Sequence, residues 1–475
     1  MYTRRSFLKT GAGIGTACLI PRLAQADEIS SINSLLDVSL EASEEWVILG
    51  GRSARLYTYN RSAQAPRLIA KPGDTVRLRL TNRLQEATNL HYHGLHVSPG
   101  GTADNVFLRV SPGATQNYEF QIPADHPGGT YWYHPHIHPN TARQVSRGLA
   151  GVFVIRGEFD RMAPFAPMPE HFLVLQDFRL DASGYLTEPS MMERMQGREG
   201  NFVTVSGEVN PTIPIPAGGW VRLRVLNASA SRYYRLSVEQ HTMYRIATDG
   251  GVVPAPEPLT ELLLTPGERA ELAVQGQRGS GAYRLLSLPY DRHSGEMMGG
   301  GMMGGGMMGG GRMGGMMGGA TPSSQLTLAT LRYQGSVAPY GLPAQLGRVD
   351  ALPAPALPLR RITLGRGMRM SFTINGRTFD HNRVDVRAKL GTIEDWEFVN
   401  ATGMDHPMHI HTNPFQVLDA SGTPMPAWKD VVNVRANSRV RVRSRFADYT
   451  GPSVFHCHIL DHEDLGMMAT LQLNA

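Results

Sequence analysis

The chain has 475 residues, of which 18% are charged, and its formal net charge at pH 7 is +5. This length predicts two to four domains with sizeable cores. Four basic residues and no acid lie in the first 26 positions, so the rest of the chain carries only about +1, and we do not expect nucleic acid as a partner.

An export signal is predicted at the N-terminus, over residues 1–26. Arg4 and Arg5 precede an apolar run and a small-residue cleavage site, which is the order found in twin-arginine signals. We therefore expect a periplasmic protein. Removal of the signal takes Cys18 with it, so the remaining cysteine, Cys457, cannot form an internal disulfide. Beyond the signal no apolar run reaches the roughly 18 residues of a membrane helix, so we expect no membrane span.

A strand pattern occurs three times along the chain. Short alternating runs flanked by glycine and asparagine lie at residues 73–82, 218–227 and 391–400. Such alternation is typical of strands with one buried face. Copies this far apart indicate duplicated domains, so we predict an all-β chain of three Greek-key β-sandwich domains. Their predicted bounds are 27–157, 158–345 and 346–475.

The first domain carries two closely spaced histidine pairs. His91 and His93 form one pair, and His134 and His136 form the other. Residues two apart on a strand share a face, so we expect both imidazoles of a pair to point the same way. A sheet edge can present nitrogen ligands to a metal in this manner. The middle copy of the pattern has Leu286 in the place of His134, so we expect the middle domain to be a spacer.

The middle domain contains a stretch, residues 296–319, made almost entirely of methionine and glycine. Glycine at this density makes ordering costly in backbone entropy, which predicts a disordered loop. Thioethers are soft ligands suited to Cu(I), so we predict that the loop captures Cu(I). The alternative is a linker without a role, produced by slippage in a repeat. The methionines are Met297, Met298, Met302, Met303, Met307, Met308, Met313, Met316 and Met317.

The third domain adds a histidine cluster at His406, His409 and His411. Met404 and Asp405 precede it directly, and we expect them either to form a docking site for the reductant or to be ordinary loop residues. With the C-terminal segment, four clusters contain 10 of the 17 histidines of the chain. Ten imidazoles are too many for one ion, and imidazoles without carboxylates favour copper over magnesium or calcium.

The segment from His456 to Met467 contains the donors of an electron-transfer copper site. Such a site takes a thiolate, two imidazoles and a weak thioether, and Cys457, His462 and Met467 supply three of them. If the segment is a strand, Cys457 points away from His456 and His458. We therefore predict that one peptide joins two metal centres.

These motifs resemble those of the multicopper oxidases, and the resemblance covers essentially the whole chain after residue 26. It is closest to bacterial three-domain laccase-like and cuprous oxidases, and it implies cupredoxin-like domains and four copper ions. Tyr92 departs from the family, which usually has tryptophan there. The resemblance assigns the type 1 copper to His406, Cys457, His462 and Met467, the type 2 copper to His91 and His409, and the two type 3 coppers to His93, His134, His136, His411, His456 and His458.

The resemblance also implies the reaction. The type 1 copper takes electrons singly from a reductant, and the other three coppers, between domains one and three, collect four electrons and reduce dioxygen to two waters. Four protons are needed, and carboxylates are the expected carriers. Glu463, beside His462, and Asp104, which aligns only with a shifted loop, match the acids of related oxidases. A surface acid without a role is the alternative for each.

Three other histidines, His96, His126 and His138, lie near the clusters but match no ligand position of the family. His138 has the strand parity of His134 and His136, so alternation alone would admit it as a ligand. We expect all three to support the ligands or to lie at the surface.

We expect a monomeric oxidase that uses dioxygen and, as its reductant, Cu(I), with a role in copper tolerance. The first alternative is a laccase-like oxidase of phenols or aromatic amines, and the second is a periplasmic copper-sequestering protein. The complete set of cluster histidines argues against sequestration, and the ligands themselves exclude a metal-free scaffold. A two-domain copper nitrite reductase fits neither the three copies nor the ligand count.

Overall fold

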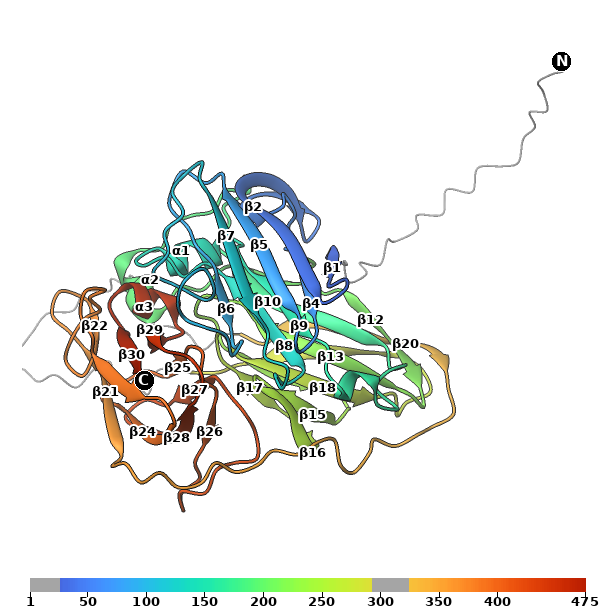
Figure 1. Ribbon diagram of the computed structural model, residues 1–475. Coiled ribbons are helices and arrows are strands. Elements are labelled where there is room, and N and C mark those ends of the chain that lie inside the picture. The colour runs from blue at the N-terminus through green and yellow to red at the C-terminus, as the bar shows by residue number, and fades with distance from the viewer. Residues whose placement is uncertain (1–25, 293–323) are drawn as a thin grey trace, which may run out of the picture.

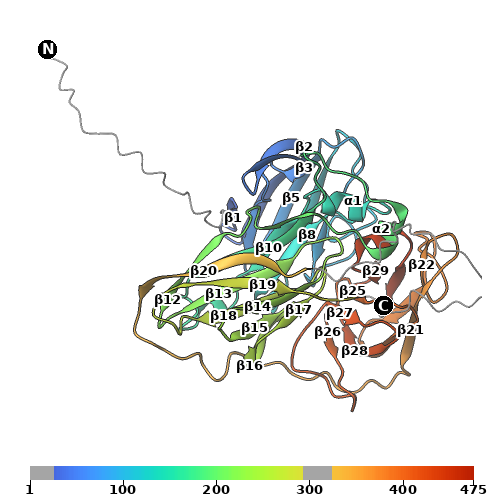
Figure 2. The same cartoon turned by 180° about the vertical axis from the view of Figure 1, so that it is seen from behind.

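The computed structural model describes residues 26–292 and 324–475. The predicted all-β class is confirmed, because strands far outnumber helices in this part of the chain and form six sheets. The sheets pack in pairs that follow the chain and are called the first, middle and third domains (Figures 1 and 2). The predicted domain bounds stay predictions. The methionines of the 296–319 stretch and all but the last residue of the export signal lie outside the described residues.

The first domain has two sheets with a shared core. One contains, in spatial order, β1 (Glu28–Ser30), β4 (Arg67–Ala70), β9 (Gly151–Ile155), β8 (Gly129–His134) and β6 (His91–His93). The other contains β3 (Arg52–Tyr59), β2 (Leu35–Leu49), β5 (Thr75–Asn82) and β7 (Thr115–Gln121). Leu36 and Leu78 from one sheet and Leu68 and Phe153 from the other belong to a single buried cluster, so the sheets form a sandwich.

The middle domain repeats this arrangement. One sheet contains β11 (Phe202–Val205), β10 (Glu170–Phe178), β13 (Trp220–Asn227), β18 (Arg269–Gln275), β15 (Met243–Thr248) and β16 (Gly251–Leu259). The other contains β12 (Thr212–Ala217), β20 (Leu326–Ser336), β19 (Ala282–Leu288), β14 (Tyr234–Val238) and β17 (Leu262–Leu264). Leu223 and Leu272 pack with Leu285 and Leu331 between them.

The third domain is again a pair of sheets. One contains β22 (Phe372–Ile374), β21 (Arg360–Arg366), β24 (Thr392–Asn400), β28 (Arg439–Phe446) and β26 (Phe415–Val417). The other contains β23 (Val386–Lys389), β30 (Met468–Asn474), β29 (Gly451–Cys457), β25 (His406–Ile410) and β27 (Val431–Val434). The core between them includes Trp396, Phe398, Met408 and Phe455.

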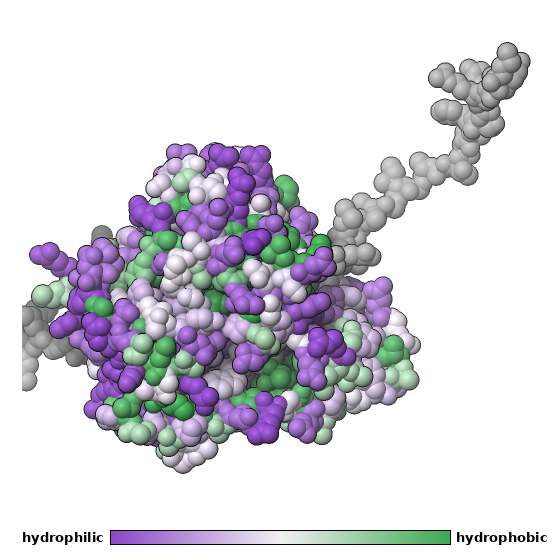
Figure 3. Space-filling view, viewed as in Figure 1, coloured by the Kyte–Doolittle hydropathy of each residue, from purple (hydrophilic) through white to green (hydrophobic). Residues whose placement is uncertain are grey.

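Short helices gather where the domains meet. They are α1 (Thr141–Ser146), α2 (Met191–Gln196) and α3 (Leu460–Asp464), and η1 (Phe159–Arg161) is a single 3-10 turn. α3 contacts both α1 and α2, and all three lie together in both views (Figures 1 and 2). No described helix is long and apolar enough to cross a membrane. Hydrophilic and hydrophobic residues are interspersed on the face seen in Figure 3.

The glycine and asparagine that flank each repeated strand have structural roles. The glycines before β5, β13 and β24 adopt φ angles of +87°, +81° and +75°, which other residues rarely adopt. The asparagine at the end of each strand donates from its amide to a carbonyl of the loop that follows and to a carbonyl of a more distant segment, and its side-chain oxygen accepts an N–H two residues later. In the third domain this loop leads directly to the first candidate copper ligand. These asparagines are Asn82, Asn227 and Asn400.

The predicted alternation is clear in β5 and lost in β13. In β5 the apolar residues are buried, and Arg77 and Arg79 between them are exposed. Every residue of β13 is buried, because its outer face packs against the first domain. There Arg224 reaches Thr130 of β8, and Arg222 and Arg224 both bond to Glu271. Contact with a neighbouring domain has therefore overridden the two-residue period.

Candidate metal centre

The predicted ligands lie where the first and third domains face each other. β6 pairs with β8 so that His91 lies opposite His134, and β25 pairs with β29 so that His409 lies opposite His456. Every predicted ligand is buried, with at most 2% of its surface exposed. Because the two strand pairs belong to different domains, the full set of side chains comes together only when these domains pack.

A thiol and two imidazoles meet within the third domain. Cys457 Sγ lies 3.5 Å from His406 Nδ1 and 3.8 Å from His462 Nδ1, and the two nitrogens are 3.2 Å apart. Met467 is held beside them by its main chain, whose N–H donates to His462 O at 2.8 Å and whose carbonyl accepts from Cys457 N at 3.0 Å. This donor set fits one copper ion.

The outer nitrogens of the two imidazoles are fixed by the protein. His406 Nε2 lies 2.8 Å from Thr402 Oγ1, and His462 Nε2 lies 3.3 Å from the carbonyl oxygen of Met195, on α2. Phe372 packs against the His462 ring with a centroid separation of 4.0 Å. These contacts turn Nδ1 of each ring towards the thiol.

The other eight histidines converge in three groups. In the first group, His456 Nε2 lies 3.1 Å from Nε2 of both His136 and His411. In the second, His91 Nε2 faces His409 Nε2 at 3.3 Å. Each group thus contains ring nitrogens close enough to share one ion, and the set of donors is entirely imidazole.

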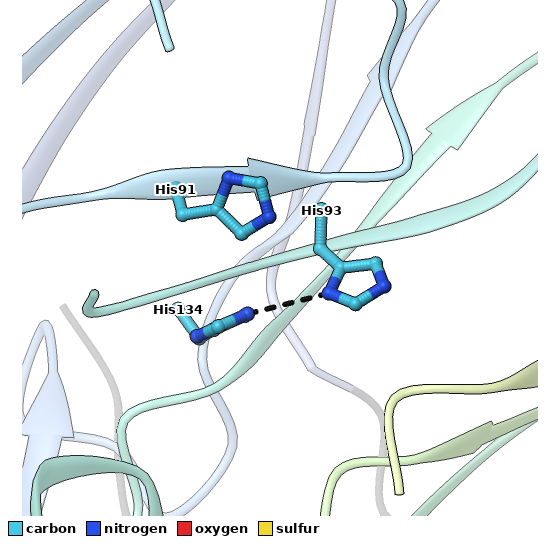
Figure 4. A group of neighbouring side chains, drawn as sticks. All are labelled: His91, His93 and His134. Atoms are coloured by element: carbon cyan, nitrogen blue, oxygen red, sulfur yellow. Dashed lines mark hydrogen bonds between the residues drawn. The ribbon is translucent and has the colours of Figure 1, made fainter. Parts of the chain in front are cut away.

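The third group consists of His93, His134 and His458. His93 Nδ1 lies 3.5 Å from His134 Nε2, and the dashed line in Figure 4 joins these two rings. The His458 ring is 4.9 Å from that of His93 and 5.7 Å from that of His134, centroid to centroid. Neither ring nitrogen of His458 has a hydrogen-bond partner among the described residues. An unpartnered buried polar group is costly, and a metal ion bound among these rings would remove that cost.

The prediction that the imidazoles of a closely spaced pair point the same way is confirmed. The two rings of each pair lie side by side, with centroids 5.4 Å apart for His91 and His93, 6.2 Å for His134 and His136, 4.7 Å for His409 and His411 and 5.6 Å for His456 and His458. The two members of a pair nevertheless belong to different groups, because His456 joins His136 and His411, whereas His458 lies beside His93 and His134. Within β29 the alternation holds, because Cys457 and His456 face different groups.

Acceptors behind the rings determine which nitrogen faces inward. His93 Nε2 lies 3.0 Å from Asp430 Oδ1, which leaves Nδ1 towards His134. His134 Nδ1 donates to the carbonyl of Pro135, and His409 Nδ1 to the carbonyl of Asp430, both at 2.8 Å. Contacts of this kind fix the tautomer and the direction of a metal-binding imidazole.

Burial keeps these imidazoles neutral. It lowers the pKa of His134 to about 3, of His136 to about 4 and of His406 to about 3. Neutral rings whose lone pairs face one another repel unless a cation lies between them. The thiol site and the histidine groups therefore both fit bound copper. Burial also lowers the pKa of His91, His93, His409, His411, His458 and His462.

The two predicted acids are buried against the histidine groups. Glu463 Oε2 lies 3.1 Å from His456 Nδ1, and Oε1 lies 3.7 Å from His136 Nδ1. Burial opposes ionisation of Glu463, but the facing histidines outweigh it and lower its pKa to about 2. Asp104 lies 2.9 and 3.0 Å from His91 Nδ1 through its two oxygens, and burial raises its pKa. The two acids thus occupy opposite electrostatic environments.

The predicted docking residues are not at the surface. Met404 is 1% exposed and Asp405 is 4% exposed. The Asp405 carboxylate accepts hydrogen bonds from Tyr290 OH at 2.6 Å, from Asn433 Nδ2 at 2.9 Å and from Ala436 N at 2.9 Å. Direct docking of a reductant on these two side chains is therefore not supported by the structure.

The three remaining histidines lie in contacts of their own. His96 Nε2 is 2.8 Å from Asp448 Oδ2, and its main-chain N–H donates to His126 Nε2 at 3.1 Å. His138 packs edge-on against Phe379. None of these histidines belongs to a group of converging metal donors in the described part of the chain.

Tyr92, the departure from the family pattern, is fully buried between the two pairing histidines of β6. Its ring packs against that of Phe120, with the ring centroids 4.6 Å apart. Its hydroxyl has no hydrogen-bond partner among the described residues. The side chain therefore fills the first core, as a tryptophan would, and lies outside the ligand groups.

Two functional contacts escaped prediction. Asp430 touches His93 and His409, and Arg269 of the middle domain bonds to both Asp430 oxygens at 2.6 Å. The groups of converging donors in the described residues contain no residue of the middle domain, as the spacer prediction implies, but the Arg269 contact with Asp430 was not predicted. A lone aspartate before a strand has no spacing relation to the histidines, so the sequence held no signal for it.

Comparison with known proteins supports one family along the whole chain. Three family models described as multicopper oxidase match residues 41–159, 170–299 and 353–474. The multicopper oxidase mco of Staphylococcus haemolyticus is 29% identical over 87% of this chain and 83% of its own length. A cell division protein, FtsP of Edwardsiella tarda, is 32% identical over 84% of this chain and 80% of its own length.

Solved structures agree. A multicopper oxidase from Campylobacter jejuni, described as a metallo-oxidase, is 30% identical, covers 96% of both chains and superposes with a TM-score of 0.79. The cupredoxin-like character of the three sandwiches is confirmed by this similarity.

Proposed function

The chain belongs to the multicopper oxidase family, and from that premise we propose that it is a cuprous oxidase. Members of the family couple oxidation of a reductant to reduction of dioxygen. In the proposed reaction four Cu(I) ions are oxidised to Cu(II), and one dioxygen with four protons becomes two waters. The observation that carries the oxidase assignment is the segment His456-Cys457-His458, whose adjacent side chains belong to the thiol site and to two of the histidine groups.

We propose four resident copper ions. Bound copper supplies one-electron redox chemistry at the thiol site and four-electron reduction of dioxygen at the histidine groups. The type 1 ion would be held by His406, Cys457, His462 and Met467. The type 2 ion would be held by His91 and His409, and the type 3 ions by His136, His411 and His456 and by His93, His134 and His458.

The protein's own side chains orient these donors and handle protons. Glu463 keeps a carboxylate within 3.1 Å of His456 Nδ1, so a proton received there lies beside the histidine groups. Asp104 and His91 Nδ1 share a hydrogen bond at the other edge. Each carboxylate thus lies within hydrogen-bond reach of a candidate ligand ring, a position from which a carboxyl group can pass a proton, so we propose both as proton carriers.

Methionines around the thiol site favour Cu(I) as the reductant. α2 begins with a capping box between Ser190 and Glu193, and its Met195 carbonyl bonds to His462. The same helix exposes Met191 and Met192, at 43% and 54%. Thioethers select Cu(I) over hard cations, so the helix that contacts this imidazole through its main chain also carries exposed soft ligands. The Met/Gly composition of residues 296–319 supports the same substrate.

The turn between β21 and β22 adds two more methionines. Met368 and Met370 are 89% and 51% exposed, and the turn runs directly into Phe372, which packs on His462. Exposed thioethers therefore occur in both of the segments that contact this imidazole, α2 and the turn before Phe372. We propose that they deliver Cu(I) in the periplasm, after export by the twin-arginine route.

Oxygen uptake with Cu(I) and with a phenolic donor tests the substrate. Replacing Met191 and Met192 together by serine should lower kcat/KM for Cu(I) about tenfold, or about 1.4 kcal/mol, and leave phenol oxidation unchanged. Met425→Ser is the matched control, because Met425 is 47% exposed and lies between β26 and β27. An equal loss of kcat/KM for Cu(I) in the double variant and in Met425→Ser would contradict the proposed role of α2.

The wild-type protein separates the alternatives. Faster uptake with the phenol than with Cu(I) would identify a laccase-like oxidase instead. Copper binding without oxygen uptake from either donor would point to sequestration, or to a non-enzymatic role such as the name of the FtsP relatives suggests.

A further inference from the structure

A fully buried arginine lies where all three domains meet. Arg269 is the first residue of β18 in the middle domain and is 1% exposed. Its Nε donates to the Thr130 carbonyl of the first domain at 3.0 Å. Its two terminal nitrogens bond to Asp430 of the third domain, each at 2.6 Å. Asp430 in turn contacts His93 of the first domain, so these two side chains together join all three domains.

All five N–H donors of Arg269 are used. Besides Thr130 and Asp430, they reach the carbonyls of Gly267 at 3.2 Å and Asp249 at 2.9 Å. A guanidinium has five donors in a fixed plane, so saturating all of them fixes its position and its orientation. The guanidinium binds both oxygens of the Asp430 carboxylate, so the position of this carboxylate is fixed as well.

Asp430 in turn fixes the orientation of two candidate ligands through hydrogen bonds. Its Oδ1 accepts from His93 Nε2 at 3.0 Å, and its main-chain carbonyl accepts from His409 Nδ1 at 2.8 Å. The two rings are stacked 3.8 Å apart at 10°. One residue thus sets the inward nitrogen of a proposed type 3 ligand and of a proposed type 2 ligand.

The surrounding backbone is shaped to admit this contact. Gly94, at φ +87°, lies so close that a Cβ there would be 2.2 Å from an Arg269 terminal nitrogen and 2.6 Å from Asp430 Oδ2. Any side chain at this position would displace the pair. The first domain therefore leaves room for a guanidinium that belongs to the middle domain.

We propose that Arg269 is a positioning residue for the histidine groups: by holding Asp430, it makes docking of the middle domain a condition for tight copper binding by His93 and His409. This inference rests on the proposed copper sites but not on the identity of the reductant. Arg269 touches no proposed copper ligand and acts through Asp430. The middle domain is on this view part of the metal centre.

The test compares Arg269→Met with Arg224→Met. Arg224 is also 1% exposed, comes from the same sheet of the middle domain and contacts Thr130, but its carboxylate partners are Asp160, Glu170 and Glu271. Both variants should lower the melting temperature of the copper-free protein. Only Arg269→Met should release copper from the histidine groups, with affinity in chelator competition falling about 10- to 100-fold, while the blue absorption of the thiol site remains.

Arg269→Lys and Asp430→Asn complete the series. Lysine keeps the charge but not the two-pronged geometry, so it should lose copper as Arg269→Met does, with a changed type 2 signal in electron paramagnetic resonance. Asp430→Asn tests the same link with a smaller change if the arginine variants do not fold. Full copper content with unchanged spectra in Arg269→Met and Asp430→Asn would overturn the proposal. Equal copper loss in Arg224→Met would also overturn it, and wild-type protein that binds no copper would refute the proposed function instead.

Discussion

The Cys457 side chain makes copper binding at the thiol site depend on proton release. Burial raises the pKa of this thiol well above its usual range, so the copper-free protein holds it protonated at neutral pH. Metal binding needs the thiolate and releases the proton. Cys457→Ser should therefore lose the blue absorption and all turnover while the histidine groups still bind copper. Absorption spectra and copper content measure both, and retention of the blue band would exclude Cys457 as the ligand.

Glu463 is a buried acid that faces two of the histidines, His456 at 3.1 Å and His136 at 3.7 Å. Glu463→Gln keeps the shape of the side chain but cannot carry a proton, so reoxidation by dioxygen should slow by about 100-fold, with the blue band retained. Stopped-flow reoxidation of the reduced protein measures the rate. Asp464→Asn on the same helix is the control, because Asp464 accepts from the main chain of Thr141 and Ala142. Unchanged reoxidation in Glu463→Gln would remove it from the proton route.

Single residues were predictable where their chemistry is rare. Histidine and cysteine at short spacings stand out in any sequence, and the structure brings all the predicted imidazoles together. Their acceptors were not predictable, because Asp430 lies 337 residues from His93 and 161 from Arg269. Nothing in its neighbours distinguishes it from an ordinary strand-flanking aspartate.

At the scale of elements, the turn before β18 touches the histidine groups directly. Gly267 has φ +85°, and a Cβ there would lie 2.8 Å from the His458 ring. Gly391, at φ +75°, has nothing within 4 Å of the same position. Alanine at either site adds backbone strain of about 1–2 kcal/mol, but only Gly267→Ala also displaces His458.

Gly267→Ala should therefore lower both the melting temperature and the copper content, whereas Gly391→Ala should lower the melting temperature alone. Calorimetry and elemental analysis measure the two effects. Equal copper content in both variants would show that the turn does not constrain His458.

Elements were predictable where they repeat. The Gly–strand–Asn pattern predicted β5, β13 and β24 because the same backbone turn and the same buried amide recur in each domain. The shared direction of the two imidazoles in a pair was also predictable, because residues two apart on a strand lie on one face. Which imidazoles share a group was not predictable, since each group combines rings from different strands.

For the molecule as a whole, three sandwiches could be predicted from sequence, but not the charges buried between them. Arg222 and Arg224 of β13 point away from their own core and meet Asp160, Glu170 and Glu271 near the boundary with the first domain. In the sequence these arginines occupy positions that alternation assigns to solvent. Only the packing of one domain on another turns them into a buried ionic network.

Because of this network, the stability of the packed first and middle domains depends on pH. Burial opposes ionisation of Glu170, but Arg224, Arg156 and Arg222 outweigh it and lower its pKa to about 2. In the unfolded chain the pKa of a glutamate is about 4.3. Because the folded state holds the proton less tightly, the stabilisation is complete above about pH 4.3 and is lost as the pH falls towards 2.

Glu170→Gln should therefore lower the free energy of unfolding by about 2–3 kcal/mol at pH 7 and by much less near pH 2, where about half of the wild-type carboxyl groups are themselves protonated. Chemical denaturation at the two pH values measures the difference. Glu188→Gln is the control, since Glu188 pairs with Arg143 and Arg147 but is 52% exposed, and such pairs contribute under about 1 kcal/mol. A loss for Glu170→Gln that is the same at pH 7 and pH 2 would mean that packing of the glutamate, rather than its charge, holds the two domains together.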